Sequence, residues 1–581
     1  MISSLKPKTT EQRHCCLRKY DLRLRALYSL GGIALSTCEP VGKTLRSVFS
    51  IHGGLCVGVL AVALLIMTVP AFAASCESLS GLKLADTTIT SAQSVAAGAF
   101  TPTPNGNPFK DVPAFCRVTA EVKPTADSDI KIEVWMPLSG WNGKYQGLGN
   151  GGFAGMIGYP GMAVAVSRGY ATASTDTGHA GSATVSSWAL GHPEKIIDFG
   201  FRSIHEMTVK AKAIIHAFYG DNPSRSYFTS CSNGGREGLM EAQRFPDDYD
   251  GILAGAPANY WTHMLVSGIW DLQALQGDAK SYIPAAKIPA ISSAVLAACD
   301  AQDGVKDGII NDPRECHFDP SITLCKEGDS KDCLTAPQVE ALKKLYSGPL
   351  NSKGQQLFTG SVVGGEDGAG GWPAWITGTG PSKSLQYAFS NGFFANMVFG
   401  DPAWDFKTFN IDSGVKVADD KAAHALNATD PNLKAFKARG GKLIIYHGWS
   451  DAAISPLNSI RYYDSVVETM GPQNANQFLR LFMAPGMQHC GGGPGPNSFG
   501  QIGNPKTPTD PQHNIYSALE EWVEKGTAPD RIVATKWVSD LDPARGAKMT
   551  RPLCAHPLVA KYKGTGDTND EANFTCVPGK K

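Results

Sequence analysis

The sequence has no surplus of either charge, because 53 lysine and arginine residues balance 53 aspartate and glutamate residues. Proteins that bind nucleic acid through bulk charge usually carry a basic excess, so we expect no nucleic-acid partner. The 63 glycines follow no three-residue period, which excludes a collagen-like chain. Charged residues make up 18% and hydrophobic residues 42% of the 581 residues, which indicates a globular protein and not a disordered one.

Long hydrophobic runs are also scarce, and the one that stands out lies at residues 55–70. Nine basic and three acidic residues precede it within residues 1–50, and Ala71-Phe72-Ala73 follows it. A basic flank, a short apolar stretch and an Ala-x-Ala site are typical of a secretory signal peptide, whereas a membrane span needs about 20 apolar residues. We predict a basic leader and signal peptide over residues 1–73, cleaved after Ala73. The mature protein would be periplasmic or secreted and free of the membrane; an uncleaved signal anchor is the alternative.

No CxxC pair occurs in the sequence, which argues against a zinc ribbon. Four of the 14 cysteines precede the predicted cleavage site, and ten follow it. An even number of cysteines in an exported chain indicates disulfide bonds, although spacing alone leaves their connectivity open.

Predicted strands and helices alternate in two parts of the chain. The first part has strands at 130–136, 144–146, 170–175, 226–229 and 251–254, with helices at 204–219 and 235–244. The second has strands at 441–446 and 478–483, with helices at 458–468 and 514–525. Such alternation predicts a parallel sheet covered on both faces. We therefore predict one α/β domain formed by residues 74–257 and 434–581, interrupted by an insertion of residues 258–433.

A candidate nucleophile lies between a predicted strand and a predicted helix, in Thr229-Ser-Cys-Ser-Asn-Gly-Gly235. This arrangement is typical of the nucleophile elbow G-x-S-x-G, with Ser232 at the tip of the turn. Ser230 stands where the pattern has its first glycine, and a serine is small enough for a tight turn. A serine in a loop is common, however, so the elbow needs support from a base and an acid.

That support comes from the ends of two later strands. Asp451 follows the strand at 441–446, and His489 follows the strand at 478–483. Catalytic residues of open α/β sheets gather at the carboxyl edge, and hydrolases of this architecture use the order Ser, Asp, His. We predict a triad of Ser232, Asp451 and His489. The weaker candidates are His447 and the pair Asp176 and His179.

Cysteines flank the predicted nucleophile and base. Cys231 precedes Ser232, and Cys490 follows His489. If serine and histidine lie within hydrogen-bonding reach, their neighbours fall within the Cα separation of about 4.4–6.8 Å that a disulfide requires. The sequence therefore predicts a Cys231–Cys490 bond at the catalytic site.

Two backbone amides are expected to stabilise the oxyanion of a tetrahedral intermediate. One belongs to Asn233, directly after the nucleophile, and the other to Gly152 in the glycine loop Gly149-Asn-Gly-Gly-Phe153. A phosphate-binding role for this loop is disfavoured, because it has neither the P-loop lysine nor the G-x-G-x-x-G spacing.

A short loop in the insertion combines carboxylates and glycines, in Cys299-Asp-Ala-Gln-Asp-Gly-Val-Lys-Asp-Gly-Ile309. Carboxylates together with backbone carbonyls suit a calcium ion, so the spacing is compatible with a structural Ca²⁺ site. The ligands would be Asp300, Asp303, Val305, Asp307 and Ile309. A solvated acidic turn is the alternative, and the spacing is not that of an EF-hand.

Several of these stretches resemble one known family. They include Cys231-Ser-Asn-Gly-Gly-Arg-Glu-Gly238, Tyr446-His-Gly-Trp-Ser-Asp451 and Pro485-Gly-Met-Gln-His-Cys490, with further matches at 249–257, 299–304, 551–554, 562–564 and 573–576. The chain resembles the tannase and feruloyl esterase family of secreted serine esterases, which includes hydrolases of mono(2-hydroxyethyl) terephthalate (MHET). The resemblance implies an α/β-hydrolase fold, the triad named above, structural calcium and no organic cofactor. It also implies the disulfides Cys76–Cys116, Cys231–Cys490, Cys299–Cys316, Cys325–Cys333 and Cys554–Cys576.

The resemblance further implies that the insertion is a lid between the nucleophile and acid strands, over a pocket for a flat aromatic acid. Candidate pocket residues are Trp261, Trp375, Ser390 and Ile454. MHET hydrolases hold the free carboxylate with a lid arginine, but residues 382–399 contain no arginine, only Lys383 and Gln386 among long polar side chains. A bidentate arginine is not replaced conservatively.

The resulting expectation is a monomeric, exported serine esterase that acts on esters of aromatic acids, of the feruloyl, galloyl or MHET type. A true MHET hydrolase is one alternative. A non-catalytic exported binding protein on a hydrolase fold is another, which the presence of Ser232, Asp451 and His489 disfavours.

Overall fold

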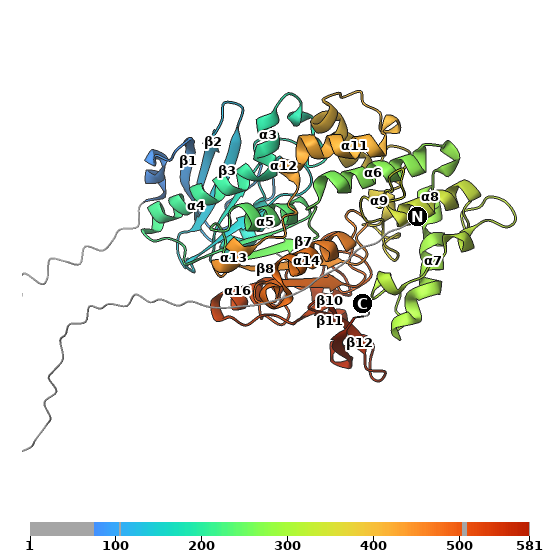
Figure 1. Ribbon diagram of the computed structural model, residues 1–581. Coiled ribbons are helices and arrows are strands. Elements are labelled where there is room, and N and C mark those ends of the chain that lie inside the picture. Colours follow the sequence, from blue (N-terminus) through green and yellow to red (C-terminus); the bar gives the residue numbers. More distant parts are fainter. Residues whose placement is uncertain (1–74, 104–105, 502–507, 580–581) are drawn as a thin grey trace, which may run out of the picture. The chain divides into compact units, whose positions relative to one another are not determined.

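The computed structural model describes residues 75–103, 106–501 and 508–579, which belong to one compact unit (Figure 1). The predicted leader, the apolar run and the cleavage site after Ala73 lie outside the described residues.

A nine-stranded sheet forms the centre of the fold, in the order β1-β2-β3-β5-β4-β6-β7-β8-β9. The six strands β5, β4, β6, β7, β8 and β9 are parallel. The strands β1, β2 and β3 extend the sheet beyond β5 and pair in antiparallel fashion. The strands are β1 (Thr87–Val95), β2 (Phe115–Val122), β3 (Ile130–Pro137), β4 (Lys144–Leu148), β5 (Ala171–Thr175), β6 (Arg225–Cys231), β7 (Gly251–Gly255), β8 (Lys442–Gly448) and β9 (Leu479–Ala484).

The sequence predicted a parallel sheet, and the antiparallel pairing of the three strands at this edge was not part of that prediction. Only seven residues, 123–129, join β2 to β3. A parallel crossover needs a dozen or more residues, so a connection of this length enforces an antiparallel pair.

Helices cover both faces of the sheet, as its buried strands require. The side chains of β8 show how the two faces divide: Leu443 and Ile445 pack with α4 (Ser203–Tyr219), α5 (Asn233–Arg244) and α14 (Leu457–Met470). Their neighbours Ile444 and Tyr446 pack with α16 (Ile515–Lys525) on the opposite face. The same face carries α2 (Tyr159–Ser167) beside Leu148 of β4. The α/β-hydrolase fold expected from the resemblance is therefore present.

The insertion between β7 and β8 is helical (Figure 1). Its α-helices are α6 (Trp261–Gln276), α7 (Ile288–Cys299), α8 (Ala336–Ser347), α9 (Trp372–Trp375), α10 (Leu385–Phe393), α11 (Ile411–Ala418) and α12 (His424–Leu426). Helix α6 packs against α8, α10 and α11, so it is the central helix of the insertion. We call residues 258–433 the lid insertion.

One stretch of the lid insertion, Ala279–Asp303, is apolar enough to meet a composition test for a membrane span, with a mean hydropathy of 1.4. It consists of short 3₁₀ turns around α7, whose 12 residues measure about 18 Å at 1.5 Å per residue. Ile288, Ile291 and Val295 of α7 are buried against α8. The large apolar residues on the buried side of α7 are thus core residues of the lid insertion.

Two antiparallel hairpins follow α16, and the sequence did not predict them. The first pairs β10 (Arg531–Trp537) with β11 (Ala547–Cys554), and the second pairs β12 (Leu558–Tyr562) with β13 (Phe574–Pro578). A disulfide between Cys554 and Cys576 joins them. The remaining short helices are α3 (Pro193–Ile197), α13 (Lys434–Ala438) and α15 (Pro472–Ala475).

Candidate active site

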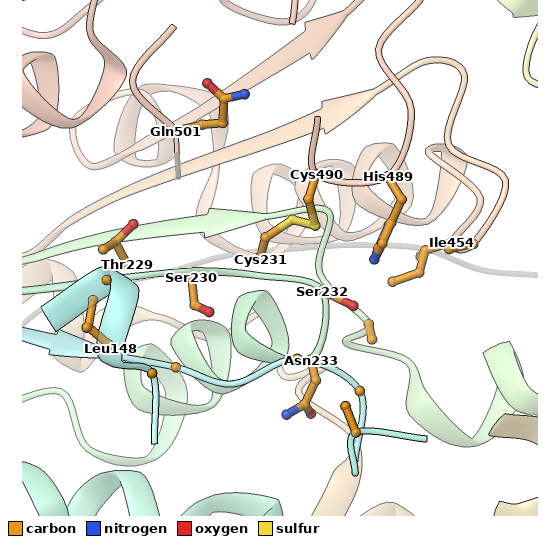
Figure 2. Close-up of a pocket in the computed structure, with 18 of the residues that line it drawn as sticks. Leu148, Thr229, Ser230, Cys231, Ser232, Asn233, Ile454, His489, Cys490 and Gln501 are labelled. Carbon is orange, nitrogen blue, oxygen red and sulfur yellow. A yellow bond between two sulfur atoms is a disulfide. The ribbon is translucent and has the colours of Figure 1, made fainter. Parts of the chain in front are cut away.

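Ser232 occupies a sharp turn between β6 and α5, with φ 67° and ψ −124° (Figure 2). Positive φ is unfavourable for a residue with a side chain, and surrounding contacts must hold it. The Ser232 amide donates to the Gly255 carbonyl at 2.9 Å, and the Ser232 carbonyl accepts from the amides of Arg236 and Ala258, each at 3.1 Å. These bonds fix the backbone on both sides of the turn.

The departure from G-x-S-x-G at Ser230 has a structural explanation. A Cβ added at Gly234 would lie 1.9 Å from the Ser230 hydroxyl oxygen, and one at Gly149 would lie 2.8 Å from the Ser230 Cβ. In the G-x-S-x-G pattern the first residue is small so that the turn can pack tightly. Here the Ser230 side chain takes up the space that side chains at Gly149 and Gly234 would need. Serine fits because Gly149 and Gly234 have no side chain.

Asp451 and His489 lie beyond the ends of β8 and β9 and contact each other. The His489 Nδ1 is 2.8 Å from Asp451 Oδ2, and Asp451 Oδ1 accepts from the amides of Ala453 at 2.8 Å and Ile454 at 3.0 Å. Burial alone would raise the pKa of Asp451, but attraction to His489 and hydrogen bonds from His447 and His489 hold it well below its usual range. Figure 2 shows the His489 imidazole directed toward Ser232. The three predicted triad residues are thus brought together.

His447 also contacts Asp451, and the sequence did not predict this contact. Its Nε2 lies 3.1 Å from Asp451 Oδ2, and its Nδ1 lies 2.7 Å from the Ser459 hydroxyl. The His447 ring is completely buried. It contacts the same Asp451 oxygen that His489 contacts, so the carboxylate is held by two imidazole rings. Among the described residues it forms no hydrogen bond with Ser232, so it is placed as a positioning residue and not as the base.

The other weaker candidates lie away from the triad. His179 Nε2 is 2.7 Å from the Phe153 carbonyl oxygen, and Asp176 accepts from the amides of Lys131 and Gly178. Burial lowers the pKa of His179 to about 4. These residues support the glycine loop and the strand ends beside it.

The disulfide between Cys231 and Cys490 joins the residue before Ser232 to the residue after His489, with a Cα–Cα distance of 6.0 Å (Figure 2). The bond spans 259 residues of sequence and the whole lid insertion. The other four pairings implied by the resemblance are also present, at Cys76–Cys116, Cys299–Cys316, Cys325–Cys333 and Cys554–Cys576.

Gly152 and Asn233 both lie beside Ser232 in the same pocket. Gly152 has φ 57°, and a Cβ there would lie 2.3 Å from the Ala183 carbonyl oxygen, so only glycine fits. Asn233 is the first residue of α5, where backbone amides have no partner within the helix. Two amides beside a serine nucleophile have the chemistry of an oxyanion hole.

Glu237 connects these two elements, and the sequence analysis missed it. Its Oε2 accepts from the Asn150 amide of the glycine loop at 2.8 Å, and its Oε1 accepts from the Asn233 side chain at 2.9 Å. The carboxyl group is fully buried, and burial raises its pKa to about 7. One side chain thus bridges the glycine loop and the residue after the nucleophile.

A pocket of about 740 Å³ opens at Ser232, between the core and the lid insertion. All four predicted substrate-binding residues line it, Trp261, Trp375, Ser390 and Ile454, together with Phe389, which the sequence did not single out. The Trp375 ring meets the His489 ring edge-on at 5.0 Å and stacks with Phe389 at 6.0 Å. The lid insertion therefore places an aromatic wall beside His489.

Gln386 also lines this wall, whereas Lys383 is exposed and is not among the described lining residues. Gln386 Nε2 donates to Asp271 Oδ2 at 2.8 Å. Asp271 is buried, and burial raises its pKa to about 8 although the bond from Gln386 opposes the shift. On the lid side the described lining residues thus include a neutral amide backed by an acid, and no basic side chain.

In the predicted calcium loop the carboxylates of Asp300 and Asp303 accept hydrogen bonds from backbone amides of the same loop. Asp300 Oδ1 accepts from the amides of Asp307 and Gly308, and Asp303 Oδ1 accepts from the Val305 amide. Burial and repulsion from the neighbouring carboxylates raise the pKa of Asp303 to about 6. A divalent cation would relieve that repulsion, and carboxylate oxygens are donors of the kind that calcium takes. One oxygen of Asp307 is already held by Arg551 at 2.6 Å, and no preformed metal-binding cluster exists within the described residues.

Comparison with known proteins agrees with this geometry. The family model described as tannase and feruloyl esterase matches residues 116–577. An uncharacterized esterase of Xanthomonas campestris is 43% identical over 535 residues, covering 88% of this chain and 92% of that protein. The mono(2-hydroxyethyl) terephthalate hydrolase of Piscinibacter sakaiensis is 35% identical over 541 residues, covering 80% of this chain and 85% of that protein.

Among solved structures, feruloyl esterase B from Aspergillus oryzae superposes with a TM-score of 0.79 at 31% identity, covering 87% of this chain and all of that one. The chain belongs to the tannase and feruloyl esterase family and is a carboxylic ester hydrolase.

Proposed function

We propose that the protein is an exported serine esterase that hydrolyses esters of aromatic acids through an acyl-enzyme on Ser232. The observation that carries the proposal is that Ser232 and His489 line one aromatic-walled pocket, with Asp451 buried behind His489 and 2.8 Å from its Nδ1. Ten cysteines paired in five disulfides support an oxidising compartment, as expected for a periplasmic or secreted protein.

The mechanism follows from the roles that these side chains can take. Asp451 orients the His489 ring through Nδ1, and His489 removes the proton from the Ser232 hydroxyl as the serine attacks the ester carbonyl. The negative charge on the carbonyl oxygen is stabilised by the amides of Gly152 and Asn233. His489 then donates its proton to the leaving alcohol. Water, activated by His489, releases the acid and restores Ser232.

The lid side of the pocket favours a flat acyl group with a neutral polar end. Trp261, Trp375 and Phe389 offer apolar ring surface, and Gln386 and Ser390 supply polar atoms. Gln386 Oε1 and the Ser390 hydroxyl have no hydrogen-bond partner among the described residues. A phenolic hydroxyl can both donate and accept there. A carboxylate would meet no cation and would lie near Asp271, so we propose phenolic esters, of the feruloyl or galloyl kind, ahead of MHET.

The first experiment measures free acid released from methyl ferulate, methyl gallate, MHET and an aliphatic ester, by wild type and by Ser232→Ala. We expect the wild type to cleave the phenolic esters best and MHET poorly, and the variant to cleave none. MHET as the preferred substrate would overturn the phenolic assignment but not the esterase. A folded wild type that cleaves none of the four would favour the alternative, a binding protein on a hydrolase fold.

We also propose that the loop of Asp300, Asp303, Val305, Asp307 and Ile309 holds a structural Ca²⁺. Its side-chain donors are the three carboxylates, of which Asp303 and Asp307 are half-buried. Bound calcium would stabilise the folded state by mass action. EDTA should therefore lower the melting temperature of the wild type, and added calcium should restore it. In Asp303→Asn both effects should shrink; equal EDTA sensitivity of the two proteins would contradict the site.

We also propose that a signal peptide is cleaved after Ala73 and that the mature protein is a monomer. N-terminal sequencing of the exported protein should begin at Ala74, and light scattering should give the mass of a monomer. A chain that keeps residues 1–73 and remains in the membrane fraction would identify an uncleaved anchor.

A further inference from the structure

The residue before the catalytic histidine reaches into the lid insertion. Gln488 directly precedes His489, and its side chain is buried. Its Nε2 donates to the Asp367 carbonyl oxygen at 2.8 Å, and its Oε1 accepts from the Gly370 amide at 3.0 Å. These two partners lie 121 and 118 residues earlier in the chain. One core side chain thus binds the lid backbone through both its donor and its acceptor.

The residue before the catalytic aspartate holds the same stretch of the lid. Ser450 directly precedes Asp451, and its hydroxyl donates to the Gly364 carbonyl oxygen at 2.7 Å. A Cβ at Gly365 would lie 2.6 Å from the Ser450 carbonyl oxygen, so the two backbones are in close contact. We call residues 364–370 the clamp segment. It is bound once beside the acid and twice beside the base.

Glycines in the clamp segment allow this close approach. A Cβ at Gly370 would lie 2.6 Å from Gln488 Oε1, and a Cβ at Gly368 would lie 3.2 Å from Gln488 Nε2. Gly364 and Gly368 have φ of 94° and 92°, a conformation that favours glycine. A side-chain amide suits the contact, because it offers a donor and an acceptor without a charge, whereas a carboxylate could only accept.

The clamp segment leads directly into α9, which carries Trp375. The Trp372 amide donates to the Glu366 carbonyl oxygen at 2.8 Å, and the Trp375 amide donates to the Gly371 carbonyl oxygen at 3.2 Å. Trp372 is buried, whereas Trp375 lines the pocket and meets the His489 ring at 5.0 Å. The position of the clamp segment therefore determines where the Trp375 ring lies relative to the base.

We propose that Gln488 is a positioning residue for substrate selectivity, which holds the clamp segment so that Trp375 can pack against an aromatic acyl group beside His489. The proposal rests on the function proposed above, because it presumes an aromatic acyl group in this pocket. Among the described residues Gln488 forms no hydrogen bond with the triad, so it acts on substrate binding and not on the proton transfers.

A free clamp segment would weaken substrate binding for a simple reason. Without the two bonds from Gln488, the segment and α9 would spend part of their time away from the core. When only a fraction of the protein is competent to bind, the apparent affinity falls by that fraction. The loss should appear in KM for an ester whose acyl group needs Trp375, and not for an aliphatic ester.

The first test measures kcat and KM of Gln488→Met, which keeps the length of the side chain and removes both hydrogen-bonding atoms. We expect KM for methyl ferulate to rise about tenfold, with kcat within about twofold of wild type. Both constants for an aliphatic methyl ester should change by less than about twofold. Gln338→Met is the matched control, because Gln338 is a buried amide that donates to the Tyr282 carbonyl elsewhere in the lid insertion; its constants should equal those of the wild type.

Gly370→Ala breaks the same contact from the lid side and decides the matter if Gln488→Met does not fold. The added Cβ would displace Gln488 Oε1, so KM for methyl ferulate should rise as in Gln488→Met. The double variant should be no worse than the more affected single variant, because both changes remove one shared contact. Gly380→Ala is the control, since its Cβ would meet Lys383 Cδ at an ordinary 3.8 Å.

Hydrogen exchange measured by mass spectrometry tests the clamp without any substrate. Amides of the clamp segment should exchange faster in Gln488→Met than in the wild type, and amides of α4 should not. KM for methyl ferulate within about twofold of wild type in both clamp variants would overturn the proposal, as would an equal loss of kcat for both esters. A wild type that cleaves no aromatic ester ends this proposal together with the proposed function, whereas unchanged exchange in an active esterase ends this proposal alone.

Discussion

The core and the lid insertion contribute to the site in different ways. The core supplies Ser232, Asp451 and His489 from positions just beyond parallel strands, where the backbone itself sets the geometry. The lid insertion supplies Trp375 and Phe389 from helices that touch the catalytic residues only through side chains. From this comparison we infer that the strand ends set reactivity and that the lid insertion, as a separate layer, adds selectivity.

The sharpest test of this division is Asp451→Asn. The change removes the acceptor that orients His489 Nδ1, and the analogous loss in a serine hydrolase costs about 10⁴-fold in kcat. Because the defect lies in the chemistry, kcat should fall by a similar factor for every ester tested. Steady-state kinetics on aromatic and aliphatic esters check this expectation.

The control is Asp401→Asn in an exposed turn of the lid insertion, which should leave kcat within twofold of wild type. If Asp451→Asn lowers kcat strongly for some esters and weakly for others, then reactivity and selectivity are not separable in this protein.

Two disulfides allow the core and the lid insertion to be compared by their contribution to the free energy of unfolding. Cys231–Cys490 closes 259 residues around the core and the lid insertion, whereas Cys325–Cys333 closes only 8 within the lid insertion. On the chain-entropy account, replacing the first pair with alanines should cost roughly 3 kcal/mol more unfolding free energy than replacing the second. Urea unfolding without reductant measures both. Equal losses would show that loop closure is not the source of the stability.

Glu237→Gln tests whether the oxyanion site depends on a contact behind it. The amide keeps the shape but replaces one acceptor oxygen with a donor, which faces the Asn150 amide or the Asn233 side chain. Removing an oxyanion donor outright costs about 10²–10³-fold in kcat, so displacing one should cost roughly 10-fold, with KM little changed.

The matched control is Glu241→Gln, one helical turn further along α5. Glu241 is as deeply buried as Glu237 but contacts neither the glycine loop nor Asn233 among the described residues. Its kcat should equal that of the wild type. Should both variants lose kcat equally, the effect belongs to a buried carboxyl group in α5 and not to the bridge.

On the lid side, Trp375→Ala should change selectivity more than reactivity. Its ring borders the pocket and meets His489 edge-on, and an aromatic contact contributes about 0.5–1.5 kcal/mol beyond its buried area. We expect kcat/KM to fall roughly tenfold for methyl ferulate and much less for an aliphatic methyl ester. An equal fall for both esters would mean that Trp375 acts through His489 and not through the substrate.

Features set by the local sequence could be predicted, whereas features that depend on contacts with distant parts of the chain could not. The core strands and the positions of Ser232, Asp451 and His489 were predictable, since buried strands have a local pattern and these three residues follow the strand ends. Glu237 was not, because a glutamate in a helix looks alike whether it faces solvent or a loop 87 residues away. The strands β1 and β10 were missed for a related reason. Their own sequences show no clear strand pattern, and they form strands because they pair with β2 and β11.

The last prediction concerns Asp271, behind Gln386 in the wall that the lid insertion gives the pocket. Its pKa is raised to about 8 by burial, whereas an aspartate in the unfolded chain ionises near 4. Between these values the folded protein keeps a proton that the unfolded chain has lost, so this group's contribution to stability falls as pH rises, by at most about 1.4 kcal/mol per pH unit. Asp271→Asn cannot titrate. Its melting temperature should therefore gain on the wild type from pH 5 to pH 8, while Asp401→Asn shows no such trend; a constant gap would mean that Asp271 is ionised and that the lid wall carries a charge.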